Sequence, residues 1–119
     1  MTQTLKLSVR VFVDDTIALG PGKLSLLESI ADNGSISAAA RAMGMSYARA
    51  WRLVDDMNRC FKTPLVITAS GGKHGGGARV TDEGRQMLSV YREMQARVRE
   101  AAADGYARIQ PLLREHTED

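Results

Sequence analysis

The sequence predicts a small, mainly helical domain with a little β-structure. Three features indicate this: alternating apolar residues near the N-terminus, four segments with helical apolar spacing and capping residues, and a glycine-rich segment between two short apolar runs. The chain has 119 residues, a length at which one domain buries about two-thirds of its unfolded surface. Residues 1–119 are therefore expected to form a single domain.

Composition excludes several classes of protein. Hydrophobic residues make up 44% of the chain and charged residues 25%, as in ordinary globular proteins. No uncharged apolar stretch approaches the roughly 20 residues of a membrane helix, and the N-terminus lacks a secretory pattern. We therefore expect a cytoplasmic protein without membrane contact. Cys60 is the only cysteine, and with two histidines it matches no zinc spacing. We expect neither a metal nor another cofactor.

Charge is unevenly distributed along the chain. The net charge is +2, but seven basic and two acidic residues between Arg41 and Arg79 give that segment +5 and leave −3 for the remainder. A basic middle segment predicts one face for a polyanion, although an asymmetry of this size also arises by chance.

The N-terminal third predicts a β-hairpin followed by a helix. Apolar residues alternate from Leu5 to Val13, and Thr16 to Leu19 can return as a second strand, so the hairpin spans 5–19. Pro21 favours a helix over 22–32, which Asn33-Gly34 would end. Its apolar stripe contains Leu24, Leu27, Ile30 and Ala31.

Residues 35–61 predict a helix-turn-helix. Ser35 can cap an alanine-rich helix that stops at Gly44, and Ser46 can cap a second helix from Tyr47 to Phe61. Two short helices around a tight glycine turn define this motif. The predicted core stripe of the second helix contains Tyr47, Ala50, Trp51, Val54, Met57 and Phe61.

The start of the second helix predicts a DNA-binding surface, because in such motifs it enters the major groove with its N-terminal residues against base edges. Arg49 and Arg52 could each fork onto a guanine. An ordinary helical hairpin with solvated arginines is the alternative. The predicted DNA-binding residues of the motif are Ser35, Ser46, Tyr47, Ala48, Arg49 and Arg52, with Tyr47 also in the core stripe.

Residues 65–80 predict a hairpin with a glycine-rich tip. A phosphate-binding loop does not match, because His74 follows Lys73 and no helix begins before Thr81. Two interpretations are left: a tip without function, or a wing in which Lys73, His74 and Arg79 contact the DNA backbone or minor groove. Beside a helix-turn-helix we favour the wing.

Thr81 can cap a final helix, expected over 82–110, which Gly105 would weaken and Pro111 would end. Apolar and small residues recur at steps of three and four, as in a helix that packs against another helix. We expect it to form a dimer. The seam contains Leu88, Tyr91, Gln95, Val98 and Ala102, of which Leu88, Tyr91 and Val98 are the predicted dimer contacts.

No catalytic constellation is evident. The paired acids are adjacent in sequence and do not face one another on a helix, and neither histidine is placed to activate a nucleophile. We therefore expect no enzymatic activity. Two alternatives stay open: a protein-interaction module, and a small enzyme or metal sensor that uses His74, Cys60 and the methionines.

Several motifs together resemble the N-terminal DNA-binding domain of the molybdate-dependent transcriptional repressor family (ModE type). The resemblance extends from about Lys6 to Ala103. Its motifs are Gly34-Ser-Ile-Ser-Ala-Ala-Ala-Arg-Ala-Met-Gly44, Met45-Ser-Tyr-Ala-Arg-Ala-Trp51 and Gly71-Gly-Lys-His-Gly-Gly-Gly77. Thr81-Asp-Glu-Gly84 also resembles the larger group of LysR-type winged helices.

The resemblance implies a bacterial-type, homodimeric winged helix-turn-helix transcription factor that binds double-stranded DNA at an inverted repeat. It implies that the 47–61 helix lies in the major groove and that the final helix forms the dimer. Full-length family members continue into a molybdate-binding domain of paired small β-barrels. Because this sequence ends at Asp119, we expect that domain to be absent, and the resemblance does not extend to molybdate binding.

Overall fold

The computed structural model describes residues 3–69 and 77–114. In chain order, the strands β1 (Val11–Val13) and β2 (Thr16–Leu19) precede the helices α1 (Pro21–Asn33), α2 (Ile36–Ala42) and α3 (Tyr47–Cys60). The strands β3 (Val66–Thr68) and β4 (Ala78–Val80) follow, and α4 (Asp82–Ile109) leads into a short 3-10 helix, Gln110–Leu112. The predicted fold class is confirmed: helices dominate, and the described strands form two small antiparallel hairpins.

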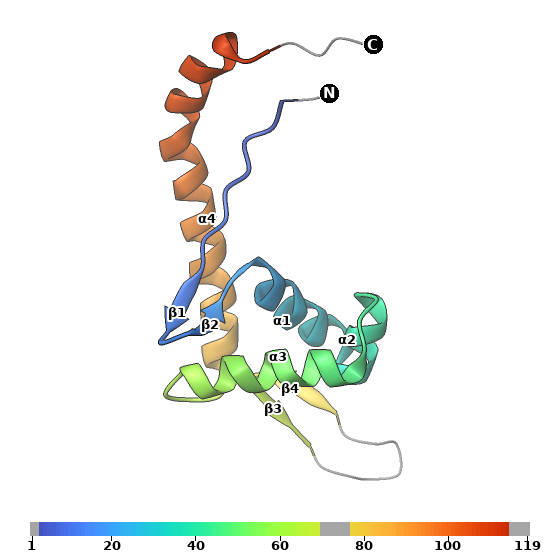
Figure 1. Cartoon of the computed structure of the whole chain (residues 1–119). Coiled ribbons are helices and arrows are strands. Elements are labelled where there is room, and N and C mark those ends of the chain that lie inside the picture. The colour runs from blue at the N-terminus through green and yellow to red at the C-terminus, as the bar shows by residue number, and fades with distance from the viewer. Residues whose placement is uncertain (1–2, 70–76, 115–119) are drawn as a thin grey trace.

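The core lies where α1, α2 and α3 pack together. Leu26, Leu27 and Ile30 of α1 are fully buried, and Met57 of α3 and Leu65 join them. Figure 1 shows these helices beside the lower part of α4, whose upper part extends beyond them. The sequence stripe of α1 missed Leu26 and included Ala31, which is exposed, because the helix packs on more than one neighbour.

The predicted N-terminal strand is wrong in length. Of the segment from Leu5 to Val13, only the last three residues pair with β2, and the register shifts between Val11 and Phe12. β2 has only four residues before α1 begins, so the earlier segment has no strand partner. It runs along α4 instead (Figure 1), where the Tyr91 hydroxyl donates to the Val9 carbonyl at 2.6 Å.

Tyr91 ties α4 to this N-terminal segment. Its side chain is 1% exposed, and burial raises the pKa of its hydroxyl above the usual value, while the charge of Arg10 acts in the opposite direction. Tyr91 therefore stays protonated and able to donate to Val9 throughout the physiological pH range.

The final helix is longer than its own domain requires. At 28 residues it spans about 42 Å, passes through Gly105 and stops before Pro111. Within the described chain its buried residues are Gly84, Leu88 and Tyr91. All three lie in its first three turns, and of the later residues Met94 is partly buried and packs against the core.

Candidate nucleic-acid interface

The helix-turn-helix is fixed by caps and by one left-handed glycine. Ser35 Oγ accepts from the Ala38 amide at 3.0 Å, and Ser46 Oγ accepts from the Arg49 amide at 3.1 Å. Between the helices, Gly44 has φ +67°, a conformation that costs glycine little. Both predicted caps and the predicted turn are confirmed.

The outer face of α3 begins cationic. Tyr47, Ala48, Arg49 and Arg52 are all exposed, and no acidic residue occurs between Ser35 and Val54. Arg49 and Arg52 are three residues apart, so their side chains leave the helix on neighbouring positions of one face. Neither arginine takes part in an ion pair with another described residue.

Further along α3, Asp55, Asp56 and Arg59 give a net charge of −1. Arg59 binds Asp55 at 3.2 Å, one helical turn apart. The unpaired positive charge of α3 is therefore concentrated at its N-terminal half, which is the half that a helix-turn-helix presents to base edges.

The core prediction for α3 was partly wrong. Ala50, Val54 and Met57 are buried, and Phe61 is half-buried just beyond the helix, which ends at Cys60. Tyr47 and Trp51, however, are 56% and 48% exposed. The buried stripe is narrower than the apolar spacing indicated, because the side of α3 that carries these two aromatics faces no other element.

Asn58, which the sequence analysis did not single out, holds α3 against β3. Its side-chain oxygen accepts from the amides of Leu65 and Val66, and its side-chain nitrogen donates to the Val66 carbonyl at 3.0 Å. A polar residue on the inner side of an amphipathic helix, followed closely by a strand, is the signal that could have indicated this role.

The base of the predicted wing is an antiparallel pair. Val66 pairs with Val80, and Ile67 pairs with Arg79. The Ala78 amide also donates to the Gly34 carbonyl at 2.9 Å, so the hairpin is attached to the start of the helix-turn-helix. Arg79 is exposed between two buried neighbours. Lys73 and His74 lie outside the described residues.

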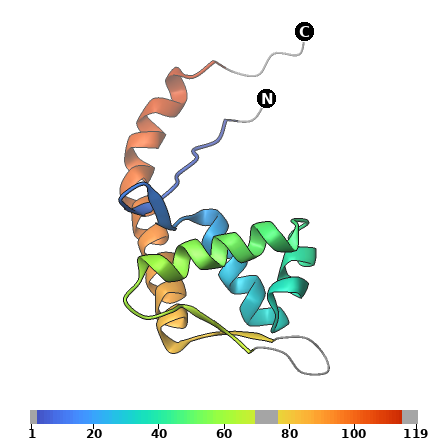
Figure 2. The same cartoon turned by 60° about the horizontal axis from the view of Figure 1, so that its bottom comes forward.

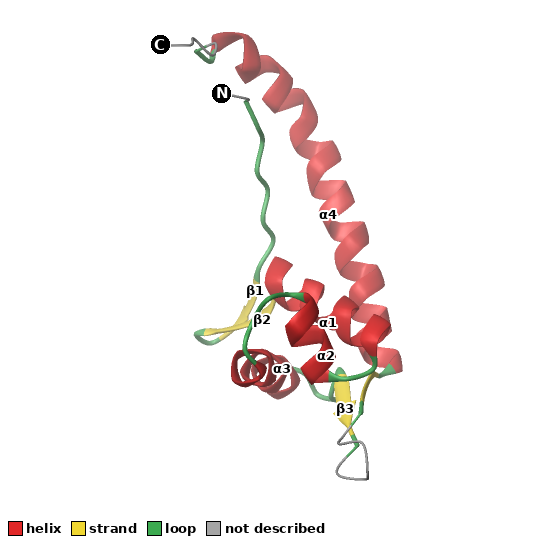
Figure 3. Cartoon of the chain, turned by 90° about the vertical axis from the view of Figure 1, so that its right-hand side faces the viewer, coloured by secondary structure: helices red, strands yellow, loops and turns green. Residues whose placement is uncertain are grey.

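The two hairpin strands emerge beside α3. Figures 2 and 3 show β3 and β4 running past this helix on one side of the domain. Asn58 of α3 is hydrogen-bonded to Val66 of β3, and β3 pairs with β4, which carries the exposed Arg79. The far end of α4 points away from α3 and from this hairpin.

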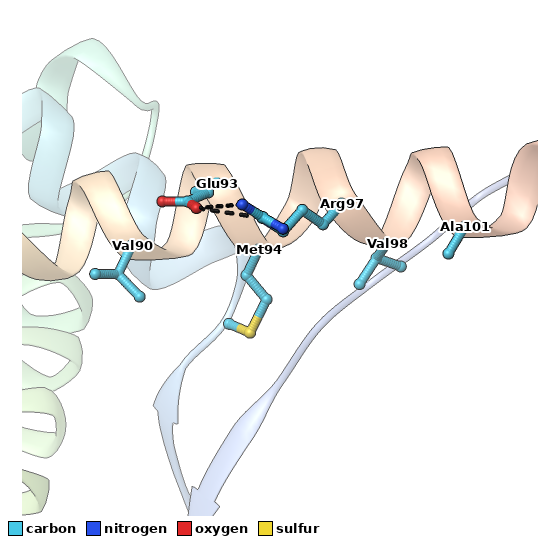
Figure 4. A pocket seen from close by; sticks show the side chains of 6 residues that line it. All are labelled: Val90, Glu93, Met94, Arg97, Val98 and Ala101. Atoms are coloured by element: carbon cyan, nitrogen blue, oxygen red, sulfur yellow. Dashed lines mark hydrogen bonds and ion pairs between the residues drawn. The ribbon is translucent and has the colours of Figure 1, made fainter.

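The predicted dimer contacts differ in burial. Leu88 is 7% and Tyr91 1% exposed, and both belong to the core of their own chain. Val98 is half-buried and lies near Leu7 and Val9. An apolar groove of about 410 Å³ lies on α4, and Figure 4 shows its lining: Val90, Glu93, Met94, Arg97, Val98 and Ala101.

The described residues offer neither a membrane-spanning helix nor a metal-binding cluster. In residues 3–69 and 77–114, no helix combines the length and apolar character needed to cross a membrane. Over the same ranges, His, Cys, Asp and Glu side chains do not gather in groups of three or more that could hold a metal ion.

A capped helix-turn-helix followed by a two-stranded hairpin defines a winged helix-turn-helix domain. The family profile described as "Bacterial regulatory helix-turn-helix protein, lysR family" matches residues 22–85, which covers both helices of the motif, the hairpin and the start of α4. The chain belongs to this family of helix-turn-helix regulators.

Curated proteins that this chain is similar to include two named ModE. The "DNA-binding transcriptional dual regulator ModE" of Escherichia coli (strain K12) is 40% identical over 101 residues, 85% of this chain and 36% of that protein. The "Molybdenum transport protein ModE" of Azotobacter vinelandii is 41% identical over 78 residues, 66% of this chain and 29% of that protein. The chain thus spans about a third of these relatives and is similar to their DNA-binding domain.

A solved structure supports the same fold. The full-length LysR-type regulator LysG from Corynebacterium glutamicum superposes with a TM-score of 0.52 and 25% identity, covering 75% of this chain and 29% of that one. The resemblance stated from the motifs is confirmed.

Proposed function

We propose that this chain is a sequence-specific DNA-binding transcriptional regulator that acts as a homodimer on an inverted repeat. The observation that carries the proposal is the exposed cationic start of α3, held by the Ser46 cap beside a hairpin that presents Arg79. In this arrangement α3 reads bases in the major groove, and the wing contacts the sugar-phosphate backbone.

Selection of bound sites from random double-stranded DNA, followed by footprinting, tests the function. We expect two half-sites in inverted orientation, with centres one helical turn apart or a multiple of it. Equal binding to all sequences, or no binding, would instead favour a protein-interaction module. Because the relatives are named for molybdenum, the selection is repeated with molybdate. We expect these 119 residues to bind equally tightly in both arms.

We expect Arg49→Ala and Arg52→Ala each to weaken binding to the selected site by about 1–3 kcal/mol and to relax one base position. The reason is that an arginine forked onto a guanine distinguishes it from other bases. Equilibrium binding to the selected site and to single-base variants measures the effect. Arg59→Ala is the control, since Arg59 is paired with Asp55 in the second half of α3. Uniform weakening on every sequence would make the arginine a phosphate contact.

The wing should act through charge alone. We expect Arg79→Ala to weaken specific and non-specific binding alike and to reduce the slope of log affinity against log salt by about one unit. Lys73→Ala should do the same if the tip follows the backbone. Arg108→Ala near the far end of α4 is the control and should leave the slope unchanged. A normal slope for Arg79→Ala would remove this residue from the interface.

A further inference from the structure

The exposed aromatic side of α3 is the feature that the proposed contacts leave unexplained. Tyr47 and Trp51 are separated by one helical turn, about 6 Å along the axis, so their rings leave the helix on the same side. About half of each side chain remains in water. A large exposed aromatic pair of this kind usually marks a surface that a partner covers.

Position and charge decide which partner covers this side of α3. Trp51 immediately precedes Arg52 and lies in the half of α3 that carries unpaired positive charge. From Ser35 to Val54 all charged residues are arginines: Arg41, Arg49 and Arg52. A second copy of the chain would bring a second cationic patch against the first, whereas DNA supplies the opposite charge. The surface therefore favours DNA over a second copy of the chain.

The chemistry of the two rings then selects the base. Indole is almost entirely apolar and offers one N–H donor. In the major groove, every base edge presents hydrogen-bonding groups, and only thymine adds an apolar one, its C5-methyl group. Placing the apolar face of the Trp51 indole against another base edge would leave polar groups of that base without partners, which is unfavourable.

On the basis of the proposed function, we infer that Trp51, supported by Tyr47, is a specificity-determining residue that packs on the C5-methyl group of a thymine in each half-site. Arg49 and Arg52 then account for guanine positions, and the aromatic pair accounts for an adjacent thymine.

Deoxyuridine provides the direct test, because it differs from thymidine only in lacking the methyl group. Each thymine of the selected duplex is replaced in turn, and binding of the unchanged protein and of Trp51→Ala is measured. At one thymine per half-site the unchanged protein should lose about fourfold in affinity, the factor for one buried methyl-sized group. Trp51→Ala should show no loss there. Phe12→Ala, which alters an exposed aromatic in the β1–β2 hairpin, should behave like the unchanged protein.

Fluorescence gives a second readout without any substitution, because Trp51 is the only tryptophan. Acrylamide quenching should fall when the selected duplex is added. Unchanged quenching in the complex, or Trp51→Ala with the same deoxyuridine sensitivity as the unchanged protein, would overturn the inference. A fall in acrylamide quenching of Trp51 on raising the protein concentration without DNA would also overturn the inference. An unchanged protein that binds no DNA would refute the proposed function itself, whereas binding without any deoxyuridine effect refutes only the thymine contact.

Discussion

Gly84→Ala should destabilise the domain by about 3 kcal/mol. A Cβ at this position would lie 2.5 Å from the Leu65 carbonyl oxygen and 2.5 Å from Val80 Cγ1. The first of these atoms is backbone and cannot rotate away, so α4 would have to move off Leu65 and β4. Thermal unfolding measures the effect, and a chain of this length should lose about 10 °C in Tm for that change.

Gly105→Ala is the matched control in the same helix. Nothing lies within 4 Å of a Cβ built at Gly105, and alanine is the better helix former, so this change should stabilise the domain by about 0.5–1 kcal/mol. If Gly84→Ala and Gly105→Ala both had a higher Tm than the wild type, the close contact between α4 and Leu65 would not exist in solution.

Val90→Asp should abolish the proposed dimer while leaving each monomer folded. Val90 is 47% exposed in the single chain and lines the apolar groove of α4 with Met94, Val98 and Ala101 (Figure 4). In a two-fold contact through this groove, each of the two chains would bury the new carboxylate without a partner. Val90 is a better position for this substitution than Val98, because Val98 also lies near Leu7 and Val9 in its own chain.

The loss of DNA affinity caused by Val90→Asp should be larger than the loss caused by removing any single base contact. Once one half-site is bound, the second binds as an intramolecular event, which raises affinity by about 10²–10⁴. Val90→Asp should lose at least about a hundredfold on the full inverted repeat and little on a single half-site. Sedimentation at micromolar concentration reports the dimer, and Ala96→Asp on the opposite side of α4 is the control. A monomeric wild type that still protects both half-sites would contradict the proposal.

The local signals in the sequence were sufficient to predict the helix-turn-helix. They were insufficient to predict which residues of α3 are exposed. Ser35, Ser46 and Thr81 were correctly predicted as caps, because capping depends on residues three positions apart. The exposure of Tyr47 and Trp51 depends on whether another element faces that side of α3, and spacing along one helix carries no such information.

The N-terminal segment illustrates a different limit of prediction from apolar spacing. Its alternation matches burial only in the middle: Leu7 and Val9 are half-buried while Lys6, Ser8 and Arg10 are exposed, but Leu5, Val11 and Val13 are exposed as well. In that middle part the pattern reports which side chains are covered, and α4 rather than a strand covers them. Likewise, the seam on α4 correctly marked Leu88 and Tyr91 as covered, but its periodicity could not tell coverage by the same chain from coverage by a second one.

The two described ends of the chain meet beyond the upper part of α4. Gln3 donates through its side chain to the carbonyl of Arg114 at 3.3 Å, and Figure 1 shows both ends far from α3 and from the β3–β4 hairpin. Immobilisation through either end would therefore leave the proposed DNA-binding face free. A short peptide linker between these positions would also close the backbone into a ring, so a circularly permuted chain could be opened elsewhere on the surface without placing a terminus near the bases.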